Sequence, residues 1–208
     1  MLKAFTAGLL LITLSELGDK TFFIAVILAM RHSRRLVFAG VWAALALMTI
    51  LSVIVGQAIS LLPQIYVDYG EIVLFITFGL KLLYDASRMP GNACETGEVL
   101  EAAAVVEEAE RELPKEPTPL AICLEAFFLT FIAEWGDRTQ IATIALAASN
   151  NWLGVTIGAI LGHGICSAIA VLGGRMIAGR ISERAITAIG GSLFLLFGAI
   201  ALLEVARG

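Results

Sequence analysis

Charged side chains are scarce in this sequence. Asp, Glu, Lys and Arg make up 15% of its 208 residues, whereas soluble domains carry about 25%. Hydrophobic residues reach 59%, and the mean hydropathy is +0.89, which excludes a water-soluble globular domain. The net charge is −4 and the basic residues form no patch, so no nucleic-acid partner is expected.

Soft metal-binding residues are also few. The chain has three cysteines and two histidines. Cys94, Cys123 and Cys166 form no CxxC pair and have no histidine cluster beside them, which excludes a disulfide framework and a structural zinc site. We interpret Cys123 and His163 as core residues rather than as recruited soft ligands, and we expect no resident cofactor.

Long apolar stretches are abundant instead. A bilayer core needs about 20 apolar residues per helix, and such stretches cover residues 4–29, 36–61, 69–88, 119–148, 152–178 and 185–206. We therefore predict an all-α integral membrane protein with six transmembrane helices in a lipid bilayer. Lys3 and the apolar residues after it imitate a signal peptide. No small-x-small cleavage site precedes Ser15, so we expect this segment to be retained as the first span.

One hexapeptide occurs twice in the chain. Glu-Leu-Gly-Asp-Lys-Thr at residues 16–21 returns as Glu-Trp-Gly-Asp-Arg-Thr at residues 134–139, 118 positions later. At the same offset Gly40 aligns with Gly158. A repeat of this length indicates a duplicated structural unit.

The duplication predicts the domain organisation. Residues 1–88 form the first three-helix repeat, residues 119–208 form the second, and residues 89–118 link them. Each repeat has an odd number of spans, so the second enters the membrane from the opposite side. Six helices in two inverted three-helix repeats are a common plan of secondary transporters.

Basic residues predict the orientation. The face with the linker carries nine of them: Arg31, Arg34, Arg35, Arg88, Arg111, Lys115, Arg175, Arg180 and Arg184. The opposite face carries only Lys3 and Arg207. We therefore expect a cytosolic linker and non-cytosolic termini, in a bacterial plasma membrane or an internal membrane such as a thylakoid.

The linker is strongly acidic, with eight glutamates between Glu95 and Glu116. Apolar residues recur at helical spacing among them, which predicts a short helix that ends at the prolines after Leu113. We interpret the linker as a solvated tether. The alternative is an acidic antenna that raises the cation concentration near the cytosolic mouth.

The two hexapeptides lie near the middle of the first and fourth predicted spans, where charge is costly. Insertion of Asp, Lys or Arg at a helix centre costs roughly 2.5 to 3.5 kcal/mol per residue. Glu16, Asp19 and Lys20 together therefore cost about 8 to 10 kcal/mol. Structural packing alone rarely requires such a cost twice, so the pattern indicates a functional site.

The spacing within the hexapeptide predicts its geometry. Glu16 and Asp19 are three residues apart, as are Glu134 and Asp137, so each pair is expected on one helix face. Each basic residue, Lys20 or Arg138, lies four positions after its glutamate and is expected to hold it. Gly18 and Gly136 are expected to support the site through a close helix approach or a local break in the helix. Thr21 and Thr139 either offer hydroxyl ligands or bond to the backbone of their own helix. Gln140 is expected to line the path or to form an interhelical hydrogen bond.

The oxygen donors of this site suit hard cations such as Ca²⁺, Mn²⁺ and Mg²⁺. Four carboxylates against Lys20 and Arg138 leave two negative charges. One divalent cation or two protons would neutralise them.

These residues resemble the Gdt-type cation/proton antiporters of Golgi, chloroplast and bacterial membranes, which move manganese and calcium. The signature Glu-x-Gly-Asp-(Lys/Arg)-(Thr/Ser) is matched at all defined positions in both copies. The resemblance extends over nearly the whole chain. It implies that Glu16, Asp19, Glu134 and Asp137 bind the cation, with Lys20, Thr21, Arg138 and Thr139 beside them.

Three other classes compete with this interpretation. Two intramembrane aspartates also occur in aspartyl proteases, but those resemble a Gly-x-Gly-Asp signature, and here glutamate holds the first position. A carboxylate cluster also selects cations in a channel, which needs no proton counterflow. A structural or lipid-binding membrane protein is the third. The sequence favours a transporter, not an enzyme, that exports Mn²⁺ or Ca²⁺ in exchange for protons, and it leaves the oligomeric state open.

Overall fold

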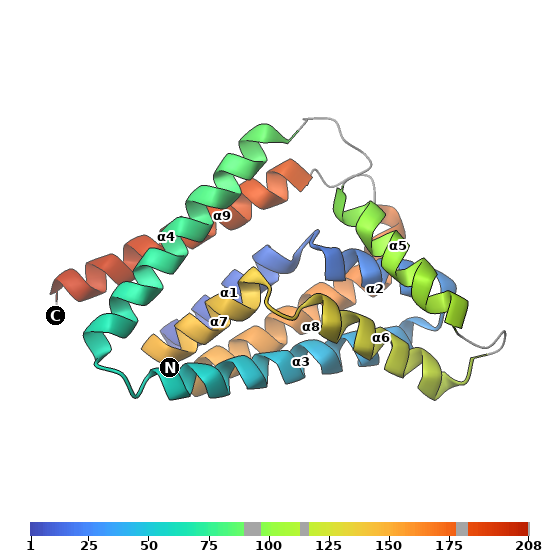
Figure 1. Ribbon diagram of the computed structural model, residues 1–208, viewed down its shortest axis with the longest axis horizontal. Coiled ribbons are helices and arrows are strands. Elements are labelled where there is room, and N and C mark those ends of the chain that lie inside the picture. The colour runs from blue at the N-terminus through green and yellow to red at the C-terminus, as the bar shows by residue number, and fades with distance from the viewer. Residues whose placement is uncertain (90–96, 113–116, 178–182, 208) are drawn as a thin grey trace.

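The computed structural model describes residues 1–89, 97–112, 117–177 and 183–207, and all regular elements within them are α-helices. The order is α1 (Leu2–Glu16), α2 (Lys20–Arg31), α3 (Arg34–Ile59), α4 (Gln64–Arg88), α5 (Gly97–Glu112), α6 (Pro119–Ala133), α7 (Arg138–Ser149), α8 (Trp152–Ile177) and α9 (Glu183–Arg207) (Figure 1). The predicted all-α class is confirmed.

Helix length and composition identify the candidate spans. Among the described residues, α3, Trp152–Gly173 of α8 and Arg184–Arg207 of α9 are each long and apolar enough to cross a bilayer. The pair α6 and α7 adds a fourth candidate if it is one bent span. The 15 residues of α1 and 12 of α2 are each too short for a hydrocarbon core of about 30 Å. The six-span inverted repeat therefore stays a prediction.

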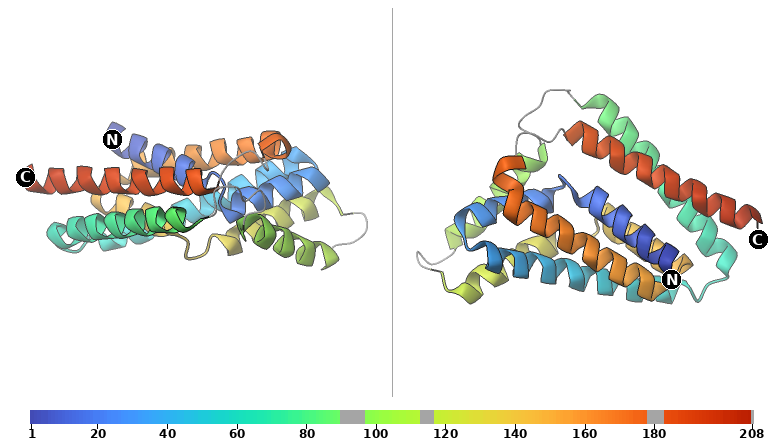
Figure 2. Two further views of the ribbon diagram at one scale, coloured as in Figure 1. Left: turned by 90° about the horizontal axis from the view of Figure 1, so that it is seen from above. Right: turned by 180° about the vertical axis from the view of Figure 1, so that it is seen from behind.

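The helices pack in long pairs. α1 lies along α8, α4 along α9, and α3 against α6, α7 and α8. Figures 1 and 2 show both termini and the α3–α4 connection toward one end of the molecule, with α5 and the α2–α3 connection toward the other. Many large apolar side chains face outward, including Ile54, Val73, Leu172 and Leu203, as expected of a surface covered by lipid.

Small residues allow the closest of these contacts. A Cβ at Gly154 or Gly158 of α8 would collide with backbone atoms of α1, and one at Gly40 of α3 would collide with the backbone of α6. The glycine stripe on α8 thus packs against another helix, as small residues do in membrane proteins. Gly40 and Gly158 are equivalent in the repeat and serve the same purpose in α3 and α8.

The linker contains the predicted helix, but the helix is not a solvated tether. α5 packs against α2, and its Ala102 and Val106 are fully buried in a core cluster with residues such as Phe22 and Val26. Of its glutamates, Glu101 and Glu110 face the basic residues Lys20 and Arg31. The tether prediction was wrong because it weighed the acidic composition above the apolar stripe.

Candidate functional site

Both hexapeptides interrupt a helix. α1 ends at Glu16 and α2 begins at Lys20, while α6 ends at Ala133 and α7 begins at Arg138. The glycine in each break has a positive φ, 81° at Gly18 and 85° at Gly136. This conformation favours glycine because it has no Cβ. The sequence left two roles open for these glycines, and the structure shows the local break. At the second break, α6 and α7 are bent by 75° relative to each other.

The aspartates cap the helices that follow the breaks. Asp19 Oδ1 accepts a hydrogen bond from Lys20 N at 2.9 Å, and Asp137 Oδ2 accepts one from Thr139 N at 3.3 Å. Negative charge at a helix N-terminus is favoured by the free N–H groups and the helix dipole. The expected common helix face of Glu16 and Asp19 was wrong, because the two residues belong to different helices.

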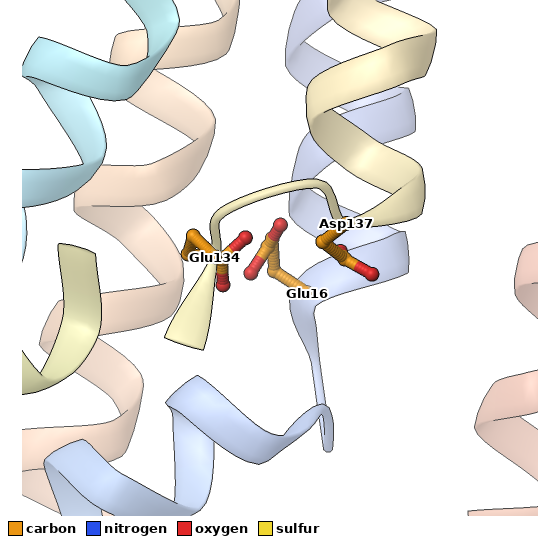
Figure 3. A group of neighbouring side chains, drawn as sticks. All are labelled: Glu16, Glu134 and Asp137. Atoms are coloured by element: carbon orange, nitrogen blue, oxygen red, sulfur yellow. The ribbon is translucent and has the colours of Figure 1, made fainter. Parts of the chain in front are cut away.

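Three carboxylates from the two copies converge. Glu16, Glu134 and Asp137 each offer one oxygen, and these oxygens lie within 4.8 Å of one another (Figure 3). Glu16 and Glu134 are 2% and 3% exposed. Glu16 Oε1 is buried without a hydrogen-bond partner. A buried carboxylate cluster with an unsatisfied oxygen is costly unless a cation or proton occupies it.

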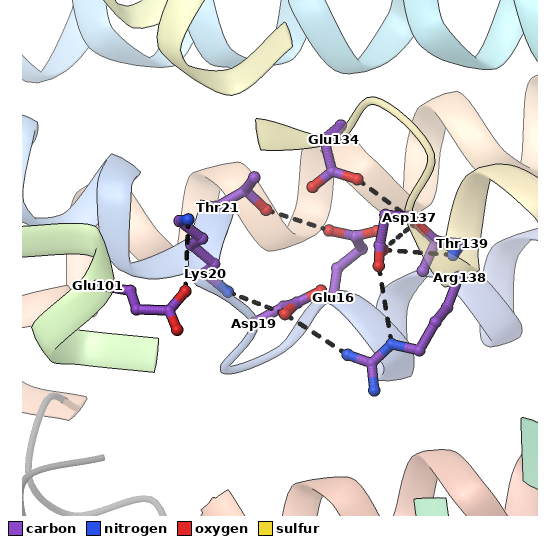
Figure 4. A network of polar contacts seen from close by, with 9 residues as sticks. All are labelled: Glu16, Asp19, Lys20, Thr21, Glu101, Glu134, Asp137, Arg138 and Thr139. Atoms are coloured by element: carbon purple, nitrogen blue, oxygen red, sulfur yellow. Dashed lines mark hydrogen bonds and ion pairs between the residues drawn. The ribbon is translucent and has the colours of Figure 1, made fainter. Parts of the chain in front are cut away.

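Asp19 lies beside this group and is joined to it through Arg138. Arg138 Nη2 is 3.5 Å from Asp19 Oδ1, and its Nε is 3.7 Å from Asp137 Oδ1 (Figure 4). The expected pairing of Arg138 with Glu134 was wrong. Arg138 instead bridges the aspartates of the two copies, because the break at Gly136 turns α7 away from the direction of α6.

Lys20 also has a different partner from the expected one. Its Nζ is 3.4 Å from Glu101 Oε2 of α5, not beside Glu16 (Figure 4). The prediction assumed a continuous helix, in which the two residues would be one turn apart. The docked linker helix therefore removes one basic residue from the carboxylate cluster.

The threonines and the glutamine hold the site together locally. Thr21 Oγ1 donates to Glu16 Oε2 at 3.4 Å, and Thr139 Oγ1 donates to Asp137 Oδ2 at 3.0 Å. The hydroxyls thus face the carboxylates rather than their own helix backbone. Gln140 Oε1 accepts a hydrogen bond from Gly136 N at 2.7 Å and stabilises the break.

A cavity of about 180 Å³ adjoins the cluster. Asp19 and Arg138 line one side, and Asp85 of α4 and Glu98 of α5 line it too. Sequence reasoning placed neither acidic residue at the site, because Asp85 lies outside the repeated hexapeptides and Glu98 was assigned to a tether. The helical spacing of apolar residues in the linker was the signal that could have placed Glu98 near a protein surface.

Comparison with known proteins identifies the family of this chain. A family described as "Divalent cation/proton antiporter GDT1" matches residues 4–90 and 122–208. A GDT1-like protein of Synechocystis is 59% identical over 96% of this chain and 97% of its own length. GDT1-like protein 4 of Oryza sativa subsp. indica is 45% identical over 95% of this chain and 72% of its own length.

A third relative is a chloroplast protein, the PAM71 homologue of Arabidopsis thaliana, which is 42% identical over 95% of this chain and 58% of its own length. No solved structure matches the chain. The matched family transports ions and is not a family of enzymes, which removes the protease alternative. With both motif copies inside the matched segments, the chain belongs to the GDT1 family of divalent cation/proton antiporters, which are integral membrane proteins.

Proposed function

We propose that the protein exports Mn²⁺ or Ca²⁺ from the cytosol in exchange for protons, through a site formed by Glu16, Glu134 and Asp137 with Asp19 close by. The observation that carries this proposal is the convergence of three carboxylate oxygens within 4.8 Å. Oxygens on opposite sides of one Ca²⁺ are about 4.6 to 5.2 Å apart, since each Ca–O distance is 2.3 to 2.6 Å. All three oxygens therefore reach one ion of this size.

Charge explains the exchange of ions. The site holds four motif carboxylates and Arg138, which is paired with Asp19 and Asp137, while Lys20 is paired with Glu101. This count leaves three negative charges at the site. A divalent cation with one proton, or three protons, neutralises them. The two neutral states differ by two protons, so we propose that about two protons exchange for each cation.

The repeated fold supports alternating access. The equivalent breaks at Gly18 and Gly136 meet at the carboxylates, and the contacts of α1 with α8 are mirrored by those of α6 with α3. We propose that the two inverted halves, residues 1–88 and 119–208, rock about this fixed site. The cavity beside Asp19 and Glu98 lies toward the linker and forms the cytosolic approach in this proposal.

Parallel flux measurements test the function. The purified protein is reconstituted in proteoliposomes with a pH reporter inside, and uptake of Mn²⁺, Ca²⁺ and Mg²⁺ is compared. We expect Mn²⁺ or Ca²⁺ flux with opposite proton flux, and weak Mg²⁺ flux because Mg²⁺ dehydrates reluctantly and needs oxygens about 2.0 to 2.1 Å away. Cation flux without proton counterflow would instead indicate a channel.

A further inference from the structure

A buried carboxylate lies on α4, outside the repeated hexapeptides. Glu71 is 6% exposed, and its Oε1 accepts a hydrogen bond from Asn150 Nδ2 at 3.4 Å. Asn150 directly follows α7, so this bond joins α4 to the end of α7. Within the part of the chain that the structure describes, Glu71 forms no ion pair. A buried charge without a basic partner is costly, and such groups in membrane proteins commonly mark functional positions.

The helix of Glu71 has an equivalent in the second half of the chain. The pattern Leu-Phe-x-x-Phe-Gly at residues 74–79 returns at residues 193–198, 119 positions later, which makes α4 equivalent to α9. Phe75 and Phe194 are equivalent in this alignment, each is 1% exposed, and their ring centroids are 5.7 Å apart. Contact between equivalent residues is what a two-fold relation between the halves requires.

The counterpart of Glu71 in this alignment is Gly190 of α9. Gly190 and Ile186 line the cavity of about 180 Å³ beside Asp19. A Cβ added at Gly190 would meet nothing within 4 Å. The glycine therefore leaves room in the route that leads to Asp19 from the linker end of the molecule.

At the other end of the molecule the equivalent place is filled. Val67, the counterpart of Ile186, is 6% exposed, and Glu71 bonds to Asn150 where α9 has only a glycine. This end holds both termini and the α3–α4 connection (Figure 1). Equivalent residues of α4 and α9 are thus covered in one half and line a cavity in the other. Inverted-repeat transporters exchange two such arrangements when they change the side to which the site opens.

We propose that Glu71 and Asn150 form the gate that closes the non-cytosolic end of the transport path. The proposal rests on the alternating access of the two halves proposed above. When α4 separates from the end of α7, Val67 and Glu71 line a route to Asp137. The carboxylate of Glu71 then faces that route and attracts the departing cation, which a glycine or an apolar side chain would not do.

Thiol labelling of the full chain in lipid nanodiscs tests the gate, because both faces of the protein are then open to the reagent. The three native cysteines are replaced by alanine, and Val67→Cys or Ile186→Cys is the single reporter. A charged, membrane-impermeant maleimide is the probe. We expect fast labelling at position 186, which lines the cavity, and slow labelling at position 67, which is covered.

Asn150→Ala removes the donor that holds Glu71. Because the hydrogen bond stabilises only the closed gate, labelling of Val67→Cys should rise about tenfold. Labelling of Ile186→Cys should fall by up to about twofold as the two states approach equal population. Glu71→Gln should change both rates in the same directions, since a neutral amide accepts a weaker hydrogen bond than a carboxylate.

Gln64→Ala is the matched control. Gln64 Nε2 donates to Asp68 Oδ1 at 2.8 Å, so this variant also removes an amide–carboxylate hydrogen bond, but one that lies within α4. Both labelling rates should stay unchanged. A rise at both reporters in Asn150→Ala would show general loosening, and it would overturn the proposal, as would an unchanged rate at position 67. Labelling needs no cation gradient, so it is read separately from the flux that tests the proposed exchange of Mn²⁺ or Ca²⁺ for protons.

Discussion

Glu16 and Glu134 occupy equivalent positions at the ends of α1 and α6, and both are almost fully buried. Each accepts a hydrogen bond from the threonine in the first turn of the next helix of its own motif, Thr21 or Thr139, at 3.4 and 3.5 Å. Two motif copies thus supply one shared cluster rather than two separate sites. This arrangement requires both copies to be intact.

Replacement of either glutamate tests that requirement. Glu16→Gln and Glu134→Gln keep the size of the side chain but remove a charge, so each should lower Mn²⁺ or Ca²⁺ flux at sub-saturating cation by about 10-fold or more. Flux in proteoliposomes at matched protein content is the measurement, with the exposed Glu108→Gln as control. Wild-type flux in either variant would remove that glutamate from the site.

Gly136 isolates the energetic cost of the backbone break. A Cβ added there meets nothing within 4 Å, so Gly136→Ala introduces no steric clash with other residues. The variant therefore measures only the cost of placing alanine in a left-handed backbone conformation, and we expect the unfolding free energy to fall by about 1 to 2 kcal/mol. Gly18→Ala should lose more, because its Cβ would lie 2.9 Å from Ile186 Cδ1. Denaturant unfolding in micelles measures both.

Gly70→Ala is the matched control for these glycines. Gly70 also has open space around it but lies inside α4 without a positive φ, so alanine should stabilise that helix slightly. Equal effects at Gly70 and Gly136 would show that the positive φ carries no cost.

At the level of elements, α5 determines the surroundings of Lys20. The partner of Lys20 is Glu101, and the two side chains are 31% and 67% exposed. An exposed pair of this kind contributes only about 0 to 1 kcal/mol. Its greater consequence is positional, because it holds the ammonium group away from the carboxylate cluster.

Removal of that partner should lower cation affinity. In Glu101→Gln the freed Lys20 can turn toward Glu16 and compete with the cation, so we expect apparent affinity to fall by up to about fivefold at unchanged maximal flux. Concentration dependence of Mn²⁺ flux is the measurement. Glu107→Gln is the matched control because Glu107 pairs with Arg111 on the outer face of the same helix. A similar loss in both variants would indicate a general effect of linker charge instead.

The hexapeptides show how far the sequence leads at this scale. Residue type and repetition sufficed to predict that carboxylates from both copies meet, and Glu16, Glu134 and Asp137 do so. Their salt-bridge partners were not predictable by helical spacing, since a positive φ at one glycine redirects every later side chain. Lys20 is 81 positions from Glu101, and only tertiary packing of the linker joins them.

For the whole molecule, the two motif copies differ in the partners of their basic residues. The first copy loses its basic residue to α5, whereas Arg138 of the second copy stays between Asp19 and Asp137. The site is therefore asymmetric although its backbone is repeated. This asymmetry changes the charge balance from two to three negative charges, and with it the number of protons that neutral states can hold.

Proton competition measures how many protons exchange for each cation. If two protons must leave before a cation binds, the apparent cation affinity should fall by up to about 100-fold for each unit by which the pH is lowered, once the site is protonated. If only one proton must leave, the affinity should fall by about tenfold per unit. Exchange of two protons for one divalent ion also moves no net charge, so flux should not respond to an imposed membrane potential. Both are measured in proteoliposomes with a K⁺ gradient and valinomycin. A tenfold slope with voltage-dependent flux would mean that only one proton exchanges for each cation.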